Sequence, residues 1–153
     1  MDQTTQLHKI IHQQNPCYTC LPADATLQRA AIALTQEKKT AVVVLENGKI
    51  EGILTRSDVL GALERDSQAL VGQNTIAQLM TRDLVLCGPR ISVAQAMDCM
   101  AESKIEHLPV VENGRLLSVI HERNLAASRI TSLQAEIAQL REYIERLHNA
   151  VED

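Results

Sequence analysis

Aromatic residues are almost absent from this chain, which has no Trp or Phe and only two Tyr among its 153 residues. Its hydrophobic core must therefore be built from aliphatic side chains. Basic runs are also missing, and a net charge of −4 at pH 7 argues against nucleic acid as a partner. No apolar run is longer than a strand, so we expect no membrane-spanning segment and no membrane partner.

The N-terminal sequence MDQTTQLHKI lacks the basic region and following apolar region of a secretory signal. Four cysteines without such a signal indicate free thiols in a reducing compartment, and we expect a cytoplasmic protein. Cys17 and Cys20 have the spacing of half a zinc site, but Cys87 and Cys99 do not form a second close pair. We therefore expect core cysteines and no metal site, with a thiol-based redox sensor as an alternative function.

The chain contains its own sequence twice. The segment from Ala25 to Asp58 aligns without a gap with the segment from Ile91 to Asn124, and both copies contain Glu-Asn-Gly. A repeat that occurs only twice indicates two related lobes. The lobes should pack together, because each one alone is too short to bury a sufficient core.

The two copies predict the same order of elements, β-α-β-β-α. The first copy predicts an amphipathic helix within 27–34, a strand at Ala41–Leu45 that is buried on both faces, and a return strand at Ile50–Leu54. Asn47-Gly48 between these strands is typical of a tight hairpin turn. The second copy predicts a helix at Val93–Ala101, strands at His107–Val111 and Leu116–Ile120, and a final helix. The predicted fold class is α/β (α+β), with two pseudo-symmetric motifs packed as a pair.

We divide the chain into an N-terminal helix within residues 1–15, a first motif at 16–66, a second motif at 67–127 and a C-terminal helix at 128–153. Thr75–Met80, near the start of the second motif, predicts a capped helical turn. Asp83–Pro89 resembles Cys17–Pro22 if one residue is skipped, and this alignment places Cys87 opposite Cys20.

The C-terminal stretch has an unbroken heptad pattern. Apolar residues recur at alternating intervals of three and four: Ile130, Leu133, Ile137, Leu140, Ile144, Leu147 and Val151. Ile or Val at the a positions with Leu at the d positions favours two parallel strands, and Glu136 can pair with Arg141 of a second chain. We therefore expect a parallel coiled coil and a homodimer with both second lobes at the same end. The alternative is a helix that folds back onto its own domain.

The segment that follows the first hairpin has the residues of a nucleotide site. Gly52 would let a ligand approach the backbone closely, and Thr55 offers a hydroxyl at the end of the strand. Asp58 follows in the first helical turn, where its carboxylate can accept hydrogen bonds from a ribose diol. The free N–H groups at this helix start, near Arg56 and Ser57, would attract a phosphate. The alternative is that Thr-x-x-Asp only caps the helix.

These motifs together resemble a tandem pair of CBS domains (cystathionine-β-synthase type) over roughly residues 15–127. The resemblance rests on GILTRSD in the first copy and on TIAQLMTRD and KIEHLPVVENGRL in the second. It implies a cleft that binds AMP, ADP or ATP, or in some members NAD or S-adenosylmethionine, as a regulatory ligand and not an obligatory cofactor. It also implies ribose binding by Thr55 and Asp58 and a flat disc of four motifs from two chains. His107 and Pro109 could border the adenine, although His107 could equally be an ordinary strand histidine.

The second copy departs from this pattern. Ser118 replaces the glycine, His121 replaces the threonine and Asn124 replaces the aspartate, with Arg123 between the last two. Asn124 lacks the charge that strengthens a hydrogen bond to a hydroxyl. We therefore predict one competent nucleotide site per chain and a degenerate second site.

No catalytic constellation emerges from the sequence, and we predict that the protein is not an enzyme. His8 and His12 share a helix face, but no third metal ligand is near them in the sequence. The favoured function is a sensor of an adenosine nucleotide that acts through its dimer, its C-terminal helices and an unknown protein effector. The alternative is a coiled-coil scaffold with a vestigial nucleotide site. The identity of the nucleotide, and whether the chain is complete or a fragment, stay open.

Overall fold

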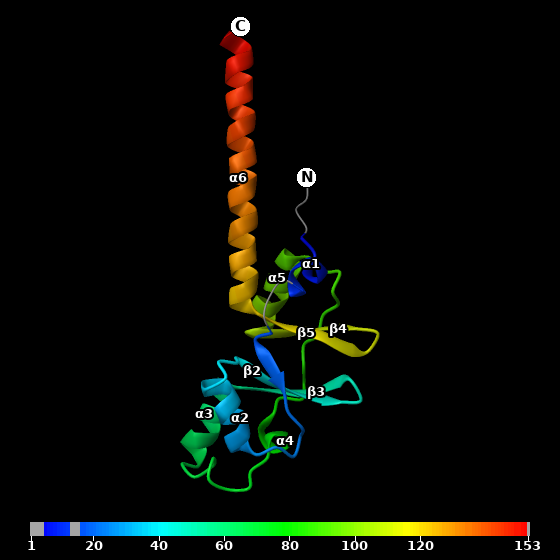
Figure 1. Ribbon diagram of the computed structural model, residues 1–153, viewed down its shortest axis with the longest axis vertical. Helices are drawn as coiled ribbons and strands as arrows, with labels where there is room; N and C mark the ends of the chain where they lie inside the picture. The colour runs from blue at the N-terminus through cyan, green and yellow to red at the C-terminus, as the bar shows by residue number, and fades with distance from the viewer. Residues whose placement is uncertain (1–4, 13–15, 153) are drawn as a thin grey trace.

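The structure is a computed structural model that describes residues 5–12 and 16–152 (Figure 1). Its elements are α1 (Leu7–Ile11), β1 (Tyr18–Cys20), α2 (Leu27–Thr35), β2 (Ala41–Glu46), β3 (Lys49–Thr55), α3 (Arg56–Arg65), α4 (Ile76–Leu79), α5 (Val93–Ser103), β4 (His107–Glu112), β5 (Arg115–His121) and α6 (Glu122–Glu152). The predicted fold class is confirmed: two similar lobes of mixed α and β structure pack together, and a long C-terminal helix follows them.

The first lobe is a three-stranded sheet in the order β1-β2-β3, covered by helices on one face. β1 runs parallel to β2, and β2 runs antiparallel to β3. Val42 and Val44 pack among α2, α3 and α4, whereas Ala41 and Val43 point into the interface with the second lobe. The predicted burial of this strand on both faces is therefore confirmed.

The second lobe has the antiparallel pair β4-β5, and its first strand is reduced to one bridge between Cys87 and Val110. The amide of Cys87 donates to the carbonyl of Pro109 at 3.1 Å, just as the amide of Leu21 donates to Val43 at 3.0 Å in the first lobe. Leu21 and Val43 each precede their counterparts by 66 residues, the offset of the repeat. Cys87 therefore corresponds to Leu21 with no residue skipped, and its predicted alignment with Cys20 was wrong.

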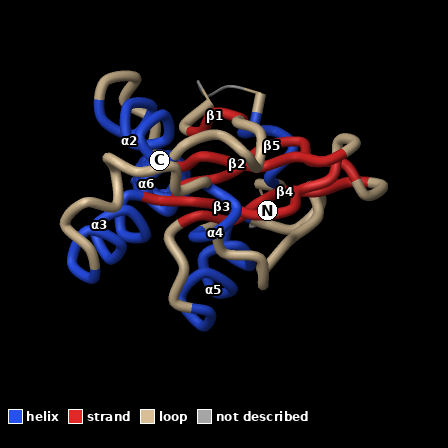
Figure 2. Tube along the Cα trace, turned by 90° about the horizontal axis from the view of Figure 1, so that it is seen from below, coloured by secondary structure: helices blue, strands red, loops and turns tan. Residues whose placement is uncertain are grey.

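The two hairpins turn in the same way and lie at the same edge of the molecule (Figures 1 and 2). Asn47 and Asn113 have φ of 52° and 51°, and the glycines that follow them have φ of 78° and 76°. Two successive residues with positive φ define the turn that suits the twist of a hairpin, as the Asn-Gly pairs predicted. The amide of Leu116 also donates to the carbonyl of Gly48 at 3.2 Å, which joins the two hairpins.

Two short helices are exchanged between the lobes. α1 packs into the core of the second lobe, whereas α4 packs into the core of the first. The amide of Leu7 donates to Ile91 at 3.0 Å, and the amide of Ile76 donates to Ala25 at 2.9 Å. Ala25 and Ile91 are equivalent in the repeat, so each lobe receives the same kind of helix from elsewhere in the chain. Packing therefore crosses the sequence division at residues 66 and 67 and interlocks the lobes.

α6 leaves the second lobe and projects away from both sheets (Figure 1). It begins at Glu122, directly after β5, and its first turns are anchored by Leu125, which is fully buried in the second core. The heptad residues from Ile130 onward are exposed, so the helix does not fold back onto its own domain. None of the described helices combines the length and the apolar character that a membrane span needs.

Candidate functional site

The main cleft lies between the two lobes and has a volume of about 310 Å³. The first lobe contributes the end of β3 and the first turn of α3, and the second contributes the segment that enters β4. Its lining residues are Ile53, Thr55, Ser57, Asp58, Thr81, Asp83, Leu84, Val85, Lys104, Ile105, Glu106, His107 and Pro109. Four residues assigned to the nucleotide site from the sequence line this cleft with Asp58: Thr55, Ser57, His107 and Pro109.

Thr55 and Asp58 are held together by a helix cap at the start of α3. Oδ2 of Asp58 accepts hydrogen bonds from the backbone N–H of Thr55 at 2.8 Å and from its hydroxyl at 3.1 Å. The alternative interpretation of Thr-x-x-Asp as a cap is therefore observed, but both side chains also line the cleft. Because Oδ2 makes both bonds, Oδ1 is the oxygen that can accept from a ligand hydroxyl. The cap fixes the direction of the carboxylate before any ligand binds.

Gly52 and Arg56, also assigned from the sequence, do not line the cleft. A Cβ built on Gly52 would lie only 2.7 Å from Cγ of Met80 and would also press on its sulfur. Glycine at this position therefore makes room for a core side chain that follows α4. Arg56 points elsewhere, because its Nε donates to the carbonyl of Leu34 at 2.9 Å near the end of α2.

His107 connects the two lobes from the wall of the cleft. Its Nε2 lies 3.0 Å from the hydroxyl oxygen of Thr40, which itself donates to the carbonyl of Cys17 at 3.1 Å. The His107 ring meets the His121 ring edge to face, with centroids 4.7 Å apart. Burial, and secondarily the neighbouring His121, lowers the pKa of His107 from 6.5 to about 4. His107 is therefore neutral near pH 7.

The cleft wall carries more negative than positive charge. Among the described residues that line it, Asp58, Asp83 and Glu106 are acidic and only Lys104 is cationic, so these four groups sum to −2 near pH 7. Sequence reasoning missed Asp83, Lys104 and Glu106, because their place on the cleft wall depends on how the two lobes pack together. The one sequence signal that pointed to any of these three residues was the repeat, which aligns Lys104 with Lys38. In the structure both lysines have positive φ.

The second, pseudo-symmetric position is a smaller cleft of about 90 Å³. Ser118 and Asn124 line it with Cys17 and Tyr18. His121 is not among its lining residues: it is only 8% exposed, and its Nδ1 accepts a hydrogen bond from the backbone N–H of Arg123 at 3.1 Å. Burial is the main cause that lowers the pKa of His121, with Arg123 adding to it.

The cysteines differ in their environments. Cys20 is exposed, so its prediction as a core cysteine was wrong: it is the last residue of β1, the edge strand of the first sheet. Cys17 is half-buried, and its thiol donates to the carbonyl of Val119 at 3.4 Å. Cys87 and Cys99 are half-buried against the second core, where burial, and then Cys99, raises the pKa of Cys87 to about 11.

Sequence comparison finds the CBS domain twice, at residues 14–65 and 76–130. The chain is 31% identical over 110 residues to the CBS domain-containing protein YhcV of Bacillus subtilis (strain 168). This match covers 72% of this chain and 77% of YhcV. It is 33% identical over 99 residues to an inosine-5'-monophosphate dehydrogenase of Nitrosopumilus maritimus (strain SCM1). The match covers 63% of this chain but only 19% of that enzyme.

Solved structures give the same result for the fold. A CBS-domain containing protein from Agrobacterium tumefaciens, ATU1752, matches 82% of this chain and 99% of its own with a TM-score of 0.74 and 28% identity. CBSX2, solved in complex with AMP, matches with a TM-score of 0.69 and 19% identity over 82% of this chain and 96% of its own. The CBS domain pair of MJ0100, solved with 5'-methylthioadenosine and S-adenosyl-L-methionine, matches with a TM-score of 0.70 and 22% identity over 86% of this chain and 98% of its own.

Proposed function

The chain belongs to the CBS domain family, with its two copies arranged as a tandem pair, and on this premise we propose that it is a regulatory module that senses an adenosine compound. The ligand binds in the cleft between the lobes and changes how two chains pack together. The dimer and its C-terminal helices then pass this change to a protein effector. The module itself catalyses no reaction.

The observation that carries the proposal is the placement of Thr55 and Asp58 on the wall of the 310 Å³ cleft. Ligand pockets generally begin at about 300 Å³. The cap at the start of α3 aims a carboxylate and a hydroxyl at the same cleft, which suits a ribose diol. His107, Pro109 and Ile53 add less polar surface that suits an adenine ring. CBSX2 and MJ0100, which share the fold, were solved with adenosine compounds.

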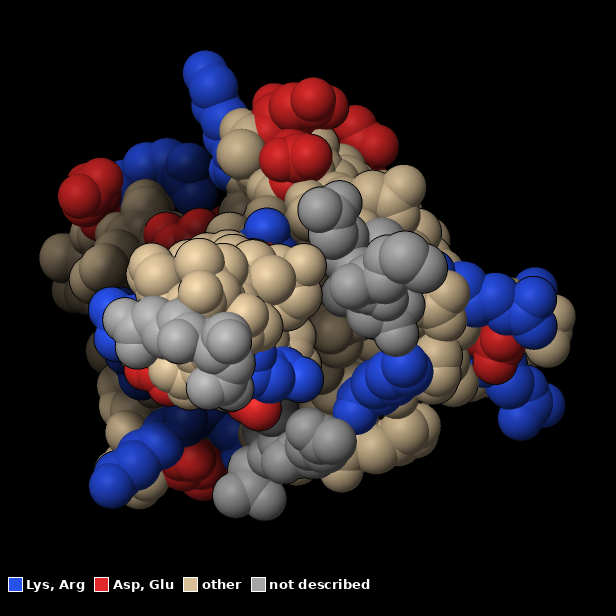
Figure 3. Space-filling view, turned by 90° about the horizontal axis from the view of Figure 1, so that it is seen from above, with Lys and Arg blue, Asp and Glu red and all other residues tan. Residues whose placement is uncertain are grey.

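The charge of the cleft favours an adenosine ligand with little negative charge. Each additional negative charge on a ligand about 8 Å from a net charge of −2 costs roughly 1 kcal/mol in water, and salt reduces this to a few tenths. We therefore expect S-adenosylmethionine and AMP to bind more tightly than ADP, and ADP more tightly than ATP. Elsewhere the charge is mixed: acidic and basic side chains are interspersed over the face seen from the C-terminal end (Figure 3).

The exposed stripe of α6 supports a dimer. Its seven heptad residues, Ile130, Leu133, Ile137, Leu140, Ile144, Leu147 and Val151, are each 40–84% exposed in the single chain. Such a continuous apolar stripe at a/d spacing is the seam of a parallel coiled coil, and Glu136 would meet Arg141 of the second chain. A shallow hollow beside Ile137 and Arg141 has only this helix as its wall and belongs to the surface that the second chain would cover. Two chains joined in this way would lie head to head in a disc of four motifs.

A direct structural route connects the cleft to α6. His107 lines the cleft, its cross-strand partner His121 ends β5, and the next residue begins α6. A ligand that moves His107 would therefore act one contact away from the start of the helix. Ligand binding can shift the dimer only if the two dimer arrangements bind the ligand with different affinity.

The second candidate function is a coiled-coil scaffold with a vestigial site, which the small second cleft and the clean heptads favour. Thermal unfolding of nucleotide-free protein with S-adenosylmethionine, AMP, ADP, ATP and NAD separates the two. A ligand at a hundred times its dissociation constant should add about 2.7 kcal/mol to the free energy of unfolding, which raises Tm by several degrees. If none of the five raises Tm, the scaffold is the better account.

Ligand-dependent dimerisation tests the transmission step. The dissociation constant of the dimer, measured by analytical ultracentrifugation, should change when the ligand is saturating, because binding and dimerisation are linked reciprocally. If a ligand raises Tm but leaves the dissociation constant of the dimer unchanged, the binding site is supported and transmission through the dimer is refuted.

A further inference from the structure

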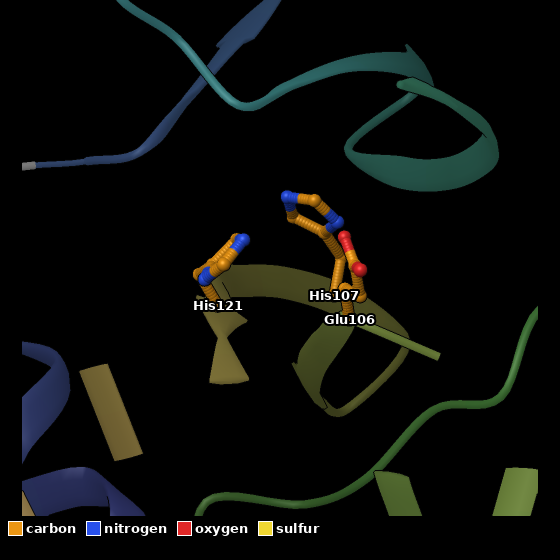
Figure 4. Close-up of side chains that lie close together, drawn as sticks. All are labelled: Glu106, His107 and His121. Atoms are coloured by element: carbon orange, nitrogen blue, oxygen red, sulfur yellow. The ribbon is translucent and has the colours of Figure 1, made fainter. Parts of the chain in front are cut away.

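Three potential metal ligands converge where β4 begins and β5 ends (Figure 4). One ligand atom from each of Glu106, His107 and His121 lies within 4.8 Å of the other two. His107 and His121 are direct partners in the register of β4 and β5, and Glu106 immediately precedes His107. The hairpin therefore brings together residues that are separate in the sequence.

The hydrogen bonds around His107 leave one ring nitrogen free to bind a cation. Thr40 donates its hydroxyl proton to the carbonyl of Cys17, so its oxygen must accept the proton of His107 Nε2. The neutral ring then has its unshared pair on Nδ1. A histidine fixed in this way by a hydrogen bond on its other nitrogen is the usual arrangement of a metal ligand.

The remaining two groups complete a set of two imidazoles and one carboxylate. Among the described residues, these three side chains make no hydrogen bonds to one another: His107 bonds to Thr40, and His121 accepts from the N–H of Arg123. Glu106 lies at the cleft side of the cluster, where an ion could keep additional water or ligand oxygens.

We propose that Glu106, His107 and His121 bind a divalent transition-metal ion of the Zn²⁺ class, at the wall shared by the cleft and the start of α6. Two imidazole nitrogens and a carboxylate oxygen suit these transition metals better than they suit Mg²⁺ or Ca²⁺, which take oxygen ligands. Bonds of about 2.0–2.1 Å place ligand atoms roughly 3–4 Å apart, so three side chains whose ligand atoms lie within 4.8 Å of one another need only a small movement to close around the ion.

Metal binding has a consequence at α6. Nδ1 of His121 accepts the backbone N–H of Arg123, so in the neutral ring the proton is on Nε2, the nitrogen that faces His107 (Figure 4). When an ion binds Nε2 of His121, the ring proton has to move from Nε2 to Nδ1. The ring stays neutral and releases no proton. The N–H of Arg123, in the first turn of α6, then loses its acceptor. The ion therefore acts on the start of the helix without any adenosine ligand, so this inference goes beyond the proposed function.

Titration of the tag-free full chain with Zn²⁺ by calorimetry, and with Co²⁺ by visible absorption, tests the site in the absence of nucleotide. We expect one ion per chain. Glu106→Gln, His107→Gln and His121→Gln should each weaken binding at least tenfold. His8→Gln and Glu112→Gln, which change an exposed histidine and an exposed carboxylate elsewhere, should bind as the unmodified chain does.

Two results would overturn the inference. One is the absence of binding by the unmodified chain at millimolar metal. The other is binding that Glu106→Gln and His107→Gln leave unchanged. Glu106 is exposed, so its substitution keeps the test valid even if loss of the buried His121 prevents folding. Circular dichroism of each variant confirms that the fold is retained.

Discussion

Substituting Gly52 with Ala separates the two roles that have been considered for this glycine. If Gly52 admits a ligand, Gly52→Ala should weaken ligand binding and leave stability alone. In the structure the added Cβ instead lies 2.7 Å from Cγ of Met80 and also presses on its sulfur, and Met80 is only 8% exposed. We therefore expect a loss of stability and little direct effect on ligand affinity.

The magnitude follows from overpacking a filled core. Inserting one methyl group into a packed core typically costs about 1–3 kcal/mol, offset in part by the 0.5–1 kcal/mol gained when Ala replaces Gly in a strand. Met80 is flexible and can move in part, so we expect a net loss of about 1–2 kcal/mol. In a protein of this size that lowers Tm by roughly 2–8 °C.

Urea unfolding at one protein concentration, followed by circular dichroism, measures this loss, and a double-mutant cycle assigns it to Met80. Met80→Ala alone should cost about 2–5 kcal/mol, and the double variant should be less destabilised than the sum by at least 1 kcal/mol. Gly61→Ala is the matched control: nothing lies within 4 Å of its added Cβ, and in a helix it should stabilise by up to about 1 kcal/mol. Additive effects of Gly52→Ala and Met80→Ala would show that the added methyl group does not press on Met80.

Three further predictions concern the histidine pair, the coil and the thiols. His107 has a pKa of about 4 in the folded protein against an ordinary 6.5, so its contribution to the free energy of unfolding is complete above pH 6.5 and is lost as pH falls towards 4. In urea unfolding, His107→Gln should therefore reduce the dependence of the free energy of unfolding on pH between 6.5 and 4. Leu140→Lys places a charge in the apolar seam of α6 and should weaken dimerisation at least tenfold in analytical ultracentrifugation. Exposed Cys20 should react with a thiol reagent at pH 7 long before Cys87, whose pKa of about 11 leaves almost no thiolate.

Each of these predictions has a control and a contradicting outcome. His8→Gln should leave the pH dependence as it is, and an identical profile for His107→Gln would contradict the first prediction. Glu142→Gln changes an outer position of the helix, and equal dimer affinity for it and for Leu140→Lys would contradict the second. Rapid modification of Cys87 in the folded protein, confirmed by peptide mapping, would contradict the third and favour the thiol-sensor alternative.

The repeat and its local patterns predicted the fold because they depend on neighbouring residues. Asn-Gly fixed both hairpin turns, since both residues tolerate positive φ, and the apolar run before the first turn predicted a strand buried on both faces. The exchange of α1 and α4 was not predicted. It depends on pairing Leu7 with Ile91 and Ile76 with Ala25, which are long-range contacts with no local signal.

The site was predictable from the sequence only in part. Thr55 and Asp58 lie in one strand-to-helix segment, so their spacing alone placed them together. The charges that face them, on Asp83, Lys104 and Glu106, come from the other lobe and depend on how the sheets pack. The environment of Gly52 was hidden for a similar reason, because Met80, which follows the exchanged helix α4, reaches it.

Calorimetric titration of nucleotide-free protein with S-adenosylmethionine and AMP, for the unmodified chain, Asp58→Asn and Asn124→Ala, tests whether the ligand site is centred on Thr55 and Asp58. We expect one ligand per chain for at least one of the two compounds. We also expect at least tenfold weaker binding to Asp58→Asn and unchanged binding to Asn124→Ala. Equal affinity for the unmodified chain and Asp58→Asn, or binding lost only in Asn124→Ala, would contradict a site centred on Thr55 and Asp58.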